Sequence, residues 1–181
     1  MGWLWMDSKT ATEKVFRSLE EDVNSPPMDL MRLTLEEAQV AAADFRGMLD
    51  VWAAKRQGAR LPDWKDFDFP DFRGWHSDIV LSIFDSEEPD PYFVLSGETF
   101  TRAVDFNVKG VHFSDGWPRL FDLQFREHFG AIRAEGLIGI TEGKVATSTR
   151  SFLSIRVLEL PLTDGGDDVK RLIHVVKVMN S

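Results

Sequence analysis

The stretch 91–100 constrains the fold of this chain more than any other. An apolar run at 92–96 stops at Gly97, a helix-compatible segment follows, and a turn-like Asn-Val-Lys-Gly at 107–110 ends that segment. An apolar run of this length suits a buried strand, and a glycine permits an abrupt change of direction. The pattern predicts a strand that breaks into short helices crossing a sheet, and such a crossing forms one wall of a small cavity.

Length and composition predict one domain with an extension. The chain has 181 residues, of which 43% are hydrophobic, and its 14 Phe and six Trp supply a core of large apolar rings. It has no Cys, which excludes disulfides, thiolate metal ligands and flavin-thiol photochemistry. No apolar run reaches the ~18 residues of a membrane-spanning helix, and the N-terminus lacks a signal-peptide pattern. We therefore expect a cytoplasmic protein without a transmembrane segment.

Charge argues against nucleic acid as a partner. The net charge is −9, and the stretch 61–100 holds ten acidic residues against two basic ones. Binding to phosphates requires a basic face, and the sequence offers none. The acidic stretch is either a solvated surface or a site for a basic partner. The spacing of its Asp63, Asp66 and Asp68 does not match a calcium loop, so we predict no metal site.

The clearest helix is expected over residues 34–58. Thr34 and Glu37 have the spacing of a capping box, and Gly58 suits the C-terminal stop. Phe45, Leu49 and Trp52 lie on its apolar face, which exceeds what a small sheet needs. These three residues are our candidates for a homodimer interface; packing on the chain's own sheet is the alternative. Residues 1–33 are predicted to be a partly helical or mobile extension, and 34–181 the domain.

The rest of the chain predicts a helix over 118–135 and four strands. The helix carries an apolar stripe, and residues 136–148 suggest a further short strand. An acidic Gly-containing segment at 164–168 is typical of a hairpin loop. The expected strands are 78–84, 92–96, 152–162 and 171–179, and the stripe consists of Phe121, Phe125, Phe129 and Ile132.

This order of elements resembles a PAS domain, in particular the PAS-related family common in alphaproteobacteria. The resemblance covers residues 40–179 and rests on several short motifs in matching order. Glu98, which separates Gly97 from Thr99, departs from the family pattern. The motifs are Trp52 with the basic Gly-x-Leu-Pro stretch 56–62, the acidic-aromatic segment 66–68, the strand end 96–99, the turn 107–110, and the stretch 158–162 before the Gly/Asp hairpin.

The resemblance implies an α+β fold with a five-stranded antiparallel sheet and helices on one face. It further implies a non-catalytic sensory module of bacterial signal transduction, which binds a small molecule, a protein partner or both. Because no output domain is visible, we expect the signal to pass to an unidentified signalling protein in trans. A ligand-free interaction scaffold is the first alternative. The second is a small enzyme with His128 or Asp105 as general base.

Two histidines and three apolar residues are the candidate ligand-binding set. His128 falls on the apolar stripe of the 118–135 helix, and His174 alternates with apolar residues of the last strand. The complete predicted set is His128, Phe125, Phe129, His174 and Ile155. His128 is also the one candidate for a haem ligand. The competing interpretation packs His128 against the sheet with a ring nitrogen bonded to a backbone carbonyl.

Overall fold

The computed structural model describes residues 27–145 and 153–179. The helices are α2 (Leu35–Ala41), α3 (Arg46–Lys55), α4 (Glu98–Val104), α5 (Phe113–Gly116), α6 (Pro118–Leu120), the π-helical turn η5 (Phe121–Phe125) and α7 (Arg126–Glu135). The strands are β1 (Asp29–Leu33), β2 (Ile79–Ile83), β3 (Tyr92–Ser96), β4 (Ile138–Val145), β5 (Leu153–Leu162) and β6 (Arg171–Met179). The 3₁₀ turn η1 (Ala43–Phe45) lies between α2 and α3, and η2 (Trp64–Asp66), η3 (Phe69–Phe72) and η4 (His76–Asp78) lie between α3 and β2.

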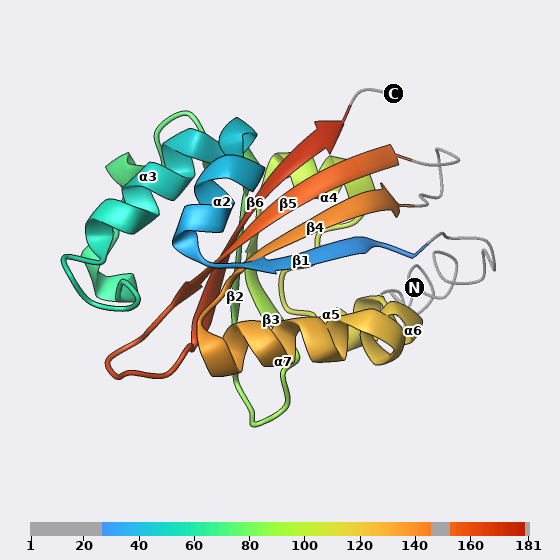
Figure 1. Cartoon of the computed structure of the whole chain (residues 1–181). Coiled ribbons are helices and arrows are strands. Elements are labelled where there is room, and N and C mark those ends of the chain that lie inside the picture. Colours follow the sequence, from blue (N-terminus) through green and yellow to red (C-terminus); the bar gives the residue numbers. More distant parts are fainter. Residues whose placement is uncertain (1–26, 146–152, 180–181) are drawn as a thin grey trace, which may run out of the picture.

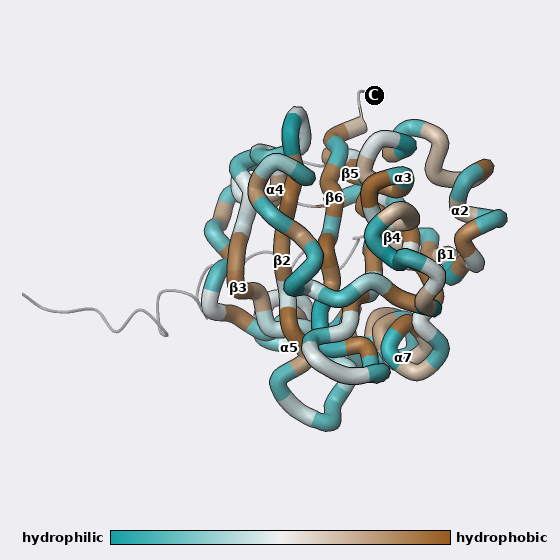
Figure 2. The backbone as a smooth tube through the Cα atoms, turned by 90° about the vertical axis from the view of Figure 1, so that its left-hand side faces the viewer, coloured by the Kyte–Doolittle hydropathy of each residue, from teal (hydrophilic) through white to brown (hydrophobic). Residues whose placement is uncertain are grey.

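One antiparallel sheet organises the described residues (Figure 1). Its strand order is β1-β4-β5-β6-β2-β3, and hydrophobic residues concentrate along the inner strands (Figure 2). The α+β fold class is confirmed. The sheet has six strands rather than the five expected, because β1 pairs with β4 at one edge. This strand lies in the segment assigned to the extension, and residues 1–26 of that segment lie outside the described residues.

No periodic pattern in the sequence indicates β1. Its side chains alternate only weakly between exposed and half-buried, as befits an edge strand. Backbone pairing with β4, from Asp29 opposite Glu142 to Leu33 opposite Ile138, places β1 in the sheet. Such pairing depends on a strand more than a hundred residues away, which no local pattern records.

Helices cover both faces of the sheet rather than one. Arg156 of β5 donates to Asp44 beside α3, whereas Glu159 of the same strand bonds His128 of α7. Positions 156 and 159 differ by an odd number of residues, so their side chains leave opposite faces of the strand. The α2–α3 segment therefore covers one face, and α4 to α7 cover the other.

The predicted helix 34–58 is present in two parts. The capping box is confirmed: the Glu37 amide donates to the Thr34 hydroxyl, and the Glu37 carboxylate accepts from the Thr34 amide. The helical run breaks at Ala42, where η1 separates α2 from α3. Helix α3 ends at Lys55, and Gln57 and Gly58 both take positive φ angles there.

The candidate dimer residues are packed inside their own chain. Phe45 and Leu49 have no exposed surface, and Trp52 is 2% exposed. The Trp52 indole also donates to the backbone carbonyl of Pro161 in β5 at 2.9 Å. The alternative interpretation, packing on the sheet, therefore describes these side chains. Homodimerisation remains a prediction.

Gly97 is required by close approach rather than by backbone angle. Its φ is −68°, which any residue adopts. A β-carbon at this position would lie 2.5 Å from the carbonyl oxygens of both Ser77 and Ile79. Between β3 and α4 the backbone passes so close to the start of β2 that a side chain at position 97 would collide with it. Glycine is therefore required here. Glu98 pairs with Arg102 on the surface of α4, away from the interior.

Candidate ligand-binding cavity

A cavity of about 380 Å³ lies between the sheet and helices α4 to α7. It is within the size range of small-molecule sites and holds the volume of about a dozen waters. Most of its wall is apolar, and a few polar groups lie on the sheet side. The sheet contributes Val80, Phe93, Thr141, Lys144, Val145, Ile155, Val157, Glu159, His174 and Val176; the cover contributes Phe100, Val104, Phe113, Trp117, Arg119, Leu120, Leu123, Gln124, Phe125 and Phe129; Pro27 and Met28 complete it.

Phe113 is the centre of the aromatic cover. Its ring centroid lies 4.5 Å from that of Phe125, 5.1 Å from Trp117 and 5.2 Å from Phe129. Contacts of this kind bury large areas and favour tilted or edge-to-face rings. The cluster joins α5, η5 and α7 into one rigid layer over the cavity. Sequence analysis missed Phe113, because a single aromatic residue in a turn-rich segment carries no periodicity.

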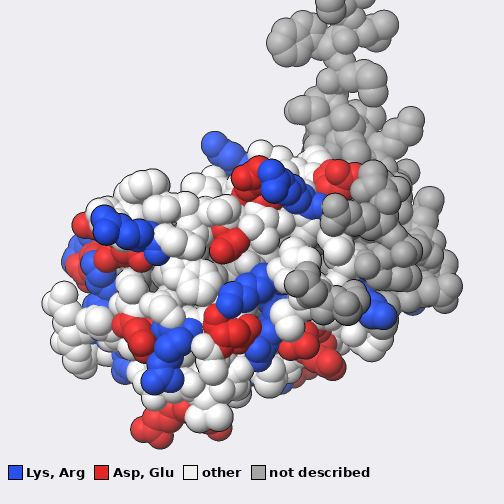
Figure 3. All heavy atoms as spheres, turned by 90° about the horizontal axis from the view of Figure 1, so that it is seen from above, with Lys and Arg blue, Asp and Glu red and all other residues white. Residues whose placement is uncertain are grey.

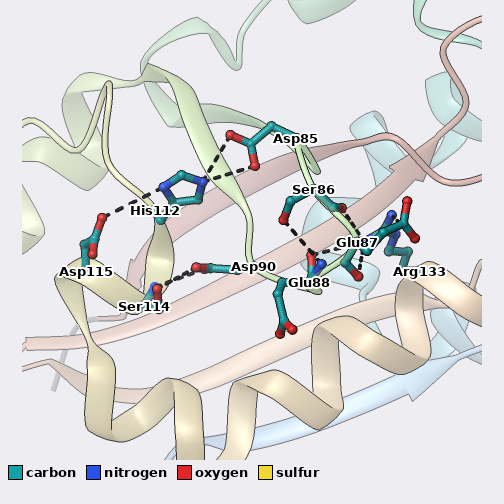
Figure 4. A network of polar contacts seen from close by, with 9 residues as sticks. All are labelled: Asp85, Ser86, Glu87, Glu88, Asp90, His112, Ser114, Asp115 and Arg133. Atoms are coloured by element: carbon teal, nitrogen blue, oxygen red, sulfur yellow. Dashed lines mark hydrogen bonds and ion pairs between the residues drawn. The ribbon is translucent and has the colours of Figure 1, made fainter.

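A polar clamp fixes this cover to the turn between β2 and β3 (Figure 4). The Asp90 carboxylate accepts from the Ser114 amide at 3.0 Å and from its hydroxyl, and so satisfies the start of α5. Arg133 of α7 donates to the carbonyls of residues 86, 87 and 88. His112 bonds both carboxylate oxygens of Asp85 at 3.1 Å. The clamp holds Phe113 and α7 in place from outside the cavity.

A buried carboxylate dominates the polar wall. Glu159 of β5 is 2% exposed, and one of its oxygens lies 2.6 Å from Nε2 of His128. Its other oxygen accepts from the Thr141 hydroxyl of β4 at 2.8 Å. His174 of β6 is paired with Glu159 in the sheet register, and its Nε2 lies 2.8 Å from the Ser82 hydroxyl. Three strands and α7 therefore converge on one acidic group.

Gly139 makes the space that this carboxylate occupies. It lies directly opposite Glu159 in the pairing of β4 with β5. A β-carbon on Gly139 would lie 2.0 Å from Oε2 of Glu159 and 2.6 Å from Cδ1 of Ile132. Any larger residue would push Glu159 away from His128. The absence of a side chain at 139 is thus part of the site.

Burial acts on both titratable groups of the wall. It opposes ionisation of Glu159, but the attraction and hydrogen bond of His128 outweigh it, so the pKa of Glu159 is lowered. Burial also lowers the pKa of His174 to about 4, against the opposing attraction of Glu159. At neutral pH the cavity therefore presents an ionised carboxylate beside an uncharged imidazole.

Four of the five predicted ligand residues line the cavity together: Phe125, Phe129, Ile155 and His174. His128 lies behind the wall, fully buried, with Nε2 engaged by Glu159 and Nδ1 without a partner. Its bond goes to a carboxylate rather than to the backbone carbonyl expected in the competing interpretation. This geometry does not fit haem ligation from the cavity, because His128 is not part of the cavity lining and its Nε2 is bonded to Glu159.

Glu159 is a further cavity-lining residue that the sequence did not single out. Ile155 and Val157 lie on one face of the strand predicted at 152–162, and the same period of two extends to Glu159. That signal was present, but a glutamate near a strand end ordinarily faces water. Only the cover supplied by α7 places this position in the interior.

The two candidate general bases of the enzyme alternative lie in different surroundings. Asp105 is exposed at the C-cap of α4, whereas His128 is a buried residue of α7. The described cavity lining contains a single carboxylate, that of Glu159.

Within residues 27–145 and 153–179, no group of three or more His, Asp or Glu side chains is arranged to hold a metal ion. Among the helices described, none has the length and hydrophobicity to cross a bilayer.

Surface charge is mixed on the face shown in Figure 3. Basic and acidic side chains of the described residues alternate there and form no continuous basic strip. Ion pairs among the described residues include Arg156 with Asp44 and with Glu142. The face in Figure 3 therefore shows no continuous basic surface of the kind that binds a polyanion.

Two of three comparisons with known proteins find matches to this chain. A search of curated proteins finds no match. One matching solved structure is that of an RNA-binding light-oxygen-voltage receptor, with 17% identity and a TM-score of 0.46 over 61% of this chain and 33% of that chain. This chain thus spans about a third of that receptor's chain. The model of a PAS domain family matches residues 40–176, which is most of the sequence. The chain therefore belongs to the PAS domain family.

Proposed function

We propose that this PAS domain is a non-catalytic sensor that binds a small molecule in its cavity and signals to a protein partner in trans. The observation that carries the proposal is the cavity itself, about 380 Å³ in volume, with apolar walls and polar groups converging on Glu159. Sites for small molecules typically combine these two features.

A route from the cavity to the surface supports the signalling role. Gln124 and Phe125 of η5 line the cavity. The Gln124 amide donates to the carbonyl of Met28 at 3.0 Å, and its oxygen accepts from the Met28 amide at 3.1 Å. Because η5 is a π-helical turn, its backbone can change from i→i+5 to i→i+4 hydrogen bonds. Such a change shifts Gln124 and Phe125 relative to β1. Ligand binding that favours one register alters the surface beside β1.

Filling the cavity tests the proposal. In Val157→Phe a larger side chain enters the cavity, and Val40→Phe makes the same change at a position that is 82% exposed. Native mass spectrometry of the full chain should show a small molecule bound to the wild type and to Val40→Phe but absent from Val157→Phe. A wild-type protein that carries no ligand from cell extract and is not stabilised by any member of a metabolite library would contradict the proposal.

A ligand-free scaffold remains the alternative proposal. It requires that partner binding be independent of the cavity. Pull-down of interacting proteins with Val157→Phe and Val40→Phe separates the two proposals. For a sensor, the amount of bound partner should change only in Val157→Phe. For a scaffold, both variants should bind the same amount.

A further inference from the structure

The ionised Glu159 has bonding capacity directed at the cavity. A carboxylate offers about four acceptor positions. Among the described residues, only His128 and Thr141 donate to it, and Glu159 belongs to the cavity lining. The remaining capacity is available to a cavity whose lining is mainly apolar and otherwise includes the polar side chains of Arg119, Gln124, Thr141, Lys144 and His174. Burying a carboxylate costs several kcal/mol unless donors surround it, so this arrangement favours a donor from outside the protein.

The cavity lining extends along β5, with this buried carboxylate at the inner end of the row. The row runs from Ile155 through Val157 to Glu159, about 13 Å of strand at ~3.3 Å per residue. The exposed Lys144 lies at the other end, since it pairs with Ser154 in the sheet, and Leu123 of the cover is 70% exposed. The rest of the lining is mainly aliphatic and aromatic and includes the polar side chains of Arg119, Gln124, Thr141 and His174.

From this arrangement, and resting on the proposed function, we propose that the ligand is an elongated and mainly apolar molecule whose inner end carries a hydrogen-bond donor, a hydroxyl or amine, that binds the Glu159 carboxylate. The aromatic cover formed by Phe113, Phe125 and Phe129 contacts its apolar body. Gly139 and Thr141 hold the carboxylate in position for this contact.

The opposite polarity, an acidic ligand held at the rim by Lys144, is less well supported by the structure. Lys144 is exposed, and attraction to an exposed ammonium group is weakened by water and salt. Glu159 is buried, and a hydrogen bond to a buried carboxylate is stronger because the surroundings polarise poorly. A carboxylate ligand entering with its acid group inward would also be repelled by Glu159.

Four probes with one common body test the assignment. Butylbenzene, 4-phenylbutan-1-ol, 4-phenylbutylamine and 4-phenylbutanoate share a phenyl ring and a four-carbon chain, and they differ at the fourth carbon of that chain. Binding to the full chain is followed by NMR shifts at Ile155 and Val157 and quantified by titration calorimetry. We expect the alcohol or the amine to bind at least tenfold more tightly than the carboxylate. In Glu159→Gln this ratio should fall below threefold, whereas Glu36→Gln, at an exposed glutamate, should keep the wild-type ratio.

The outcomes separate this inference from the proposed function. If 4-phenylbutanoate binds the wild type as tightly as the alcohol and the amine, the donor assignment is overturned, while cavity binding stands. If none of the four probes shifts Ile155 or Val157, the ligand assignment is overturned, while the native mass spectrometry described above decides the proposed function. Should Glu159→Gln not fold, the head-group ratio measured on the wild type alone decides the assignment.

Discussion

The two faces of the sheet differ in how tightly they are packed, although the same strands form both. On one face Phe45, Leu49 and Trp52 have almost no exposure and fill the space between α3 and β5. On the other face the cover of α4 to α7 leaves a cavity and a buried carboxylate at Glu159. Alternate residues of β5 therefore serve a solid core and a binding site.

The comparison shows how stability and binding can be separated within one strand. The face covered by α3, the solid face, is held by apolar packing and by two cation–π contacts. The cationic groups of Lys177 and Arg156 lie 5.1 Å and 6.0 Å from the Phe45 ring centroid. Dispersion and burial there offset the loss of packing around the cavity. The cavity face can then keep polar groups that a stability-optimised core would exclude.

The largest loss of stability should come from removing a large side chain from the solid face. We expect Phe45→Ala to lower the free energy of unfolding by about 3–5 kcal/mol, because a fully buried ring leaves a void that α3 cannot fill. Urea denaturation followed by fluorescence measures the change. Val40→Ala, at an exposed position, is the control and should stay within about 0.5 kcal/mol. A loss below about 1 kcal/mol for Phe45→Ala would show that the solid face is not the main source of stability.

Acid should weaken the cavity face through His174. Its folded pKa is about 4 against an ordinary value of 6.5, so the unfolded state takes up the proton first as the pH falls. The free energy of unfolding should therefore decrease between pH 6.5 and 4, by on the order of 3 kcal/mol. Below this window, the lowered pKa of Glu159 makes its contribution disappear in the same direction.

Denaturation series at several pH values check this prediction. His174→Gln removes the titrating ring and should flatten the dependence between pH 6.5 and 4. The same slope in the variant and the wild type would assign the acid sensitivity to other groups and weaken the contrast between the two faces.

The smallest effect is expected from crowding the carboxylate. Gly139→Ala introduces a β-carbon 2.0 Å from the present position of Glu159 Oε2, so the side chain must move and its bond to His128 must lengthen. Overpacking of this kind costs about 1–3 kcal/mol. The loss in unfolding free energy and a changed NMR signal of the His128 ring are the measurements.

Gly166→Ala is the matched control for this variant, since a β-carbon there meets nothing within 4 Å. It should be close to neutral. If Gly139→Ala were equally neutral, the carboxylate would have freedom to move, and the cavity face would be less rigid than its hydrogen bonds imply.

Local signals predicted most of the elements with accuracy. The capping box at Thr34 and Glu37 begins α2 as expected, and the strand predicted at 92–96 is β3. The stripe of the 118–135 helix is buried, and Gly136 ends α7 in the left-handed conformation. These features depend on contacts within a few residues, which sequence patterns record directly.

Strand β4 shows where such signals stop. Ile138 to Thr141 are four consecutive buried residues, because both faces of the sheet are covered at this point. Alternation is lost when both faces are buried, so the sequence indicated only an ambiguous short strand where the structure has eight residues. The π-helical turn η5 was likewise invisible inside a continuous helical pattern.

By itself the sequence determined the element types, the family resemblance and four of the five residues proposed to line a cavity. Only the tertiary structure decided the site: His128 meets Glu159 across 31 positions, Thr141 across 18, and Gly139 supplies the space opposite. The physical reason is that a period of two fixes which side chains share a face of a strand, whereas burial depends on what covers that face. For β5 that cover is α7, and it buries the Glu159 side chain in the wall of the cavity.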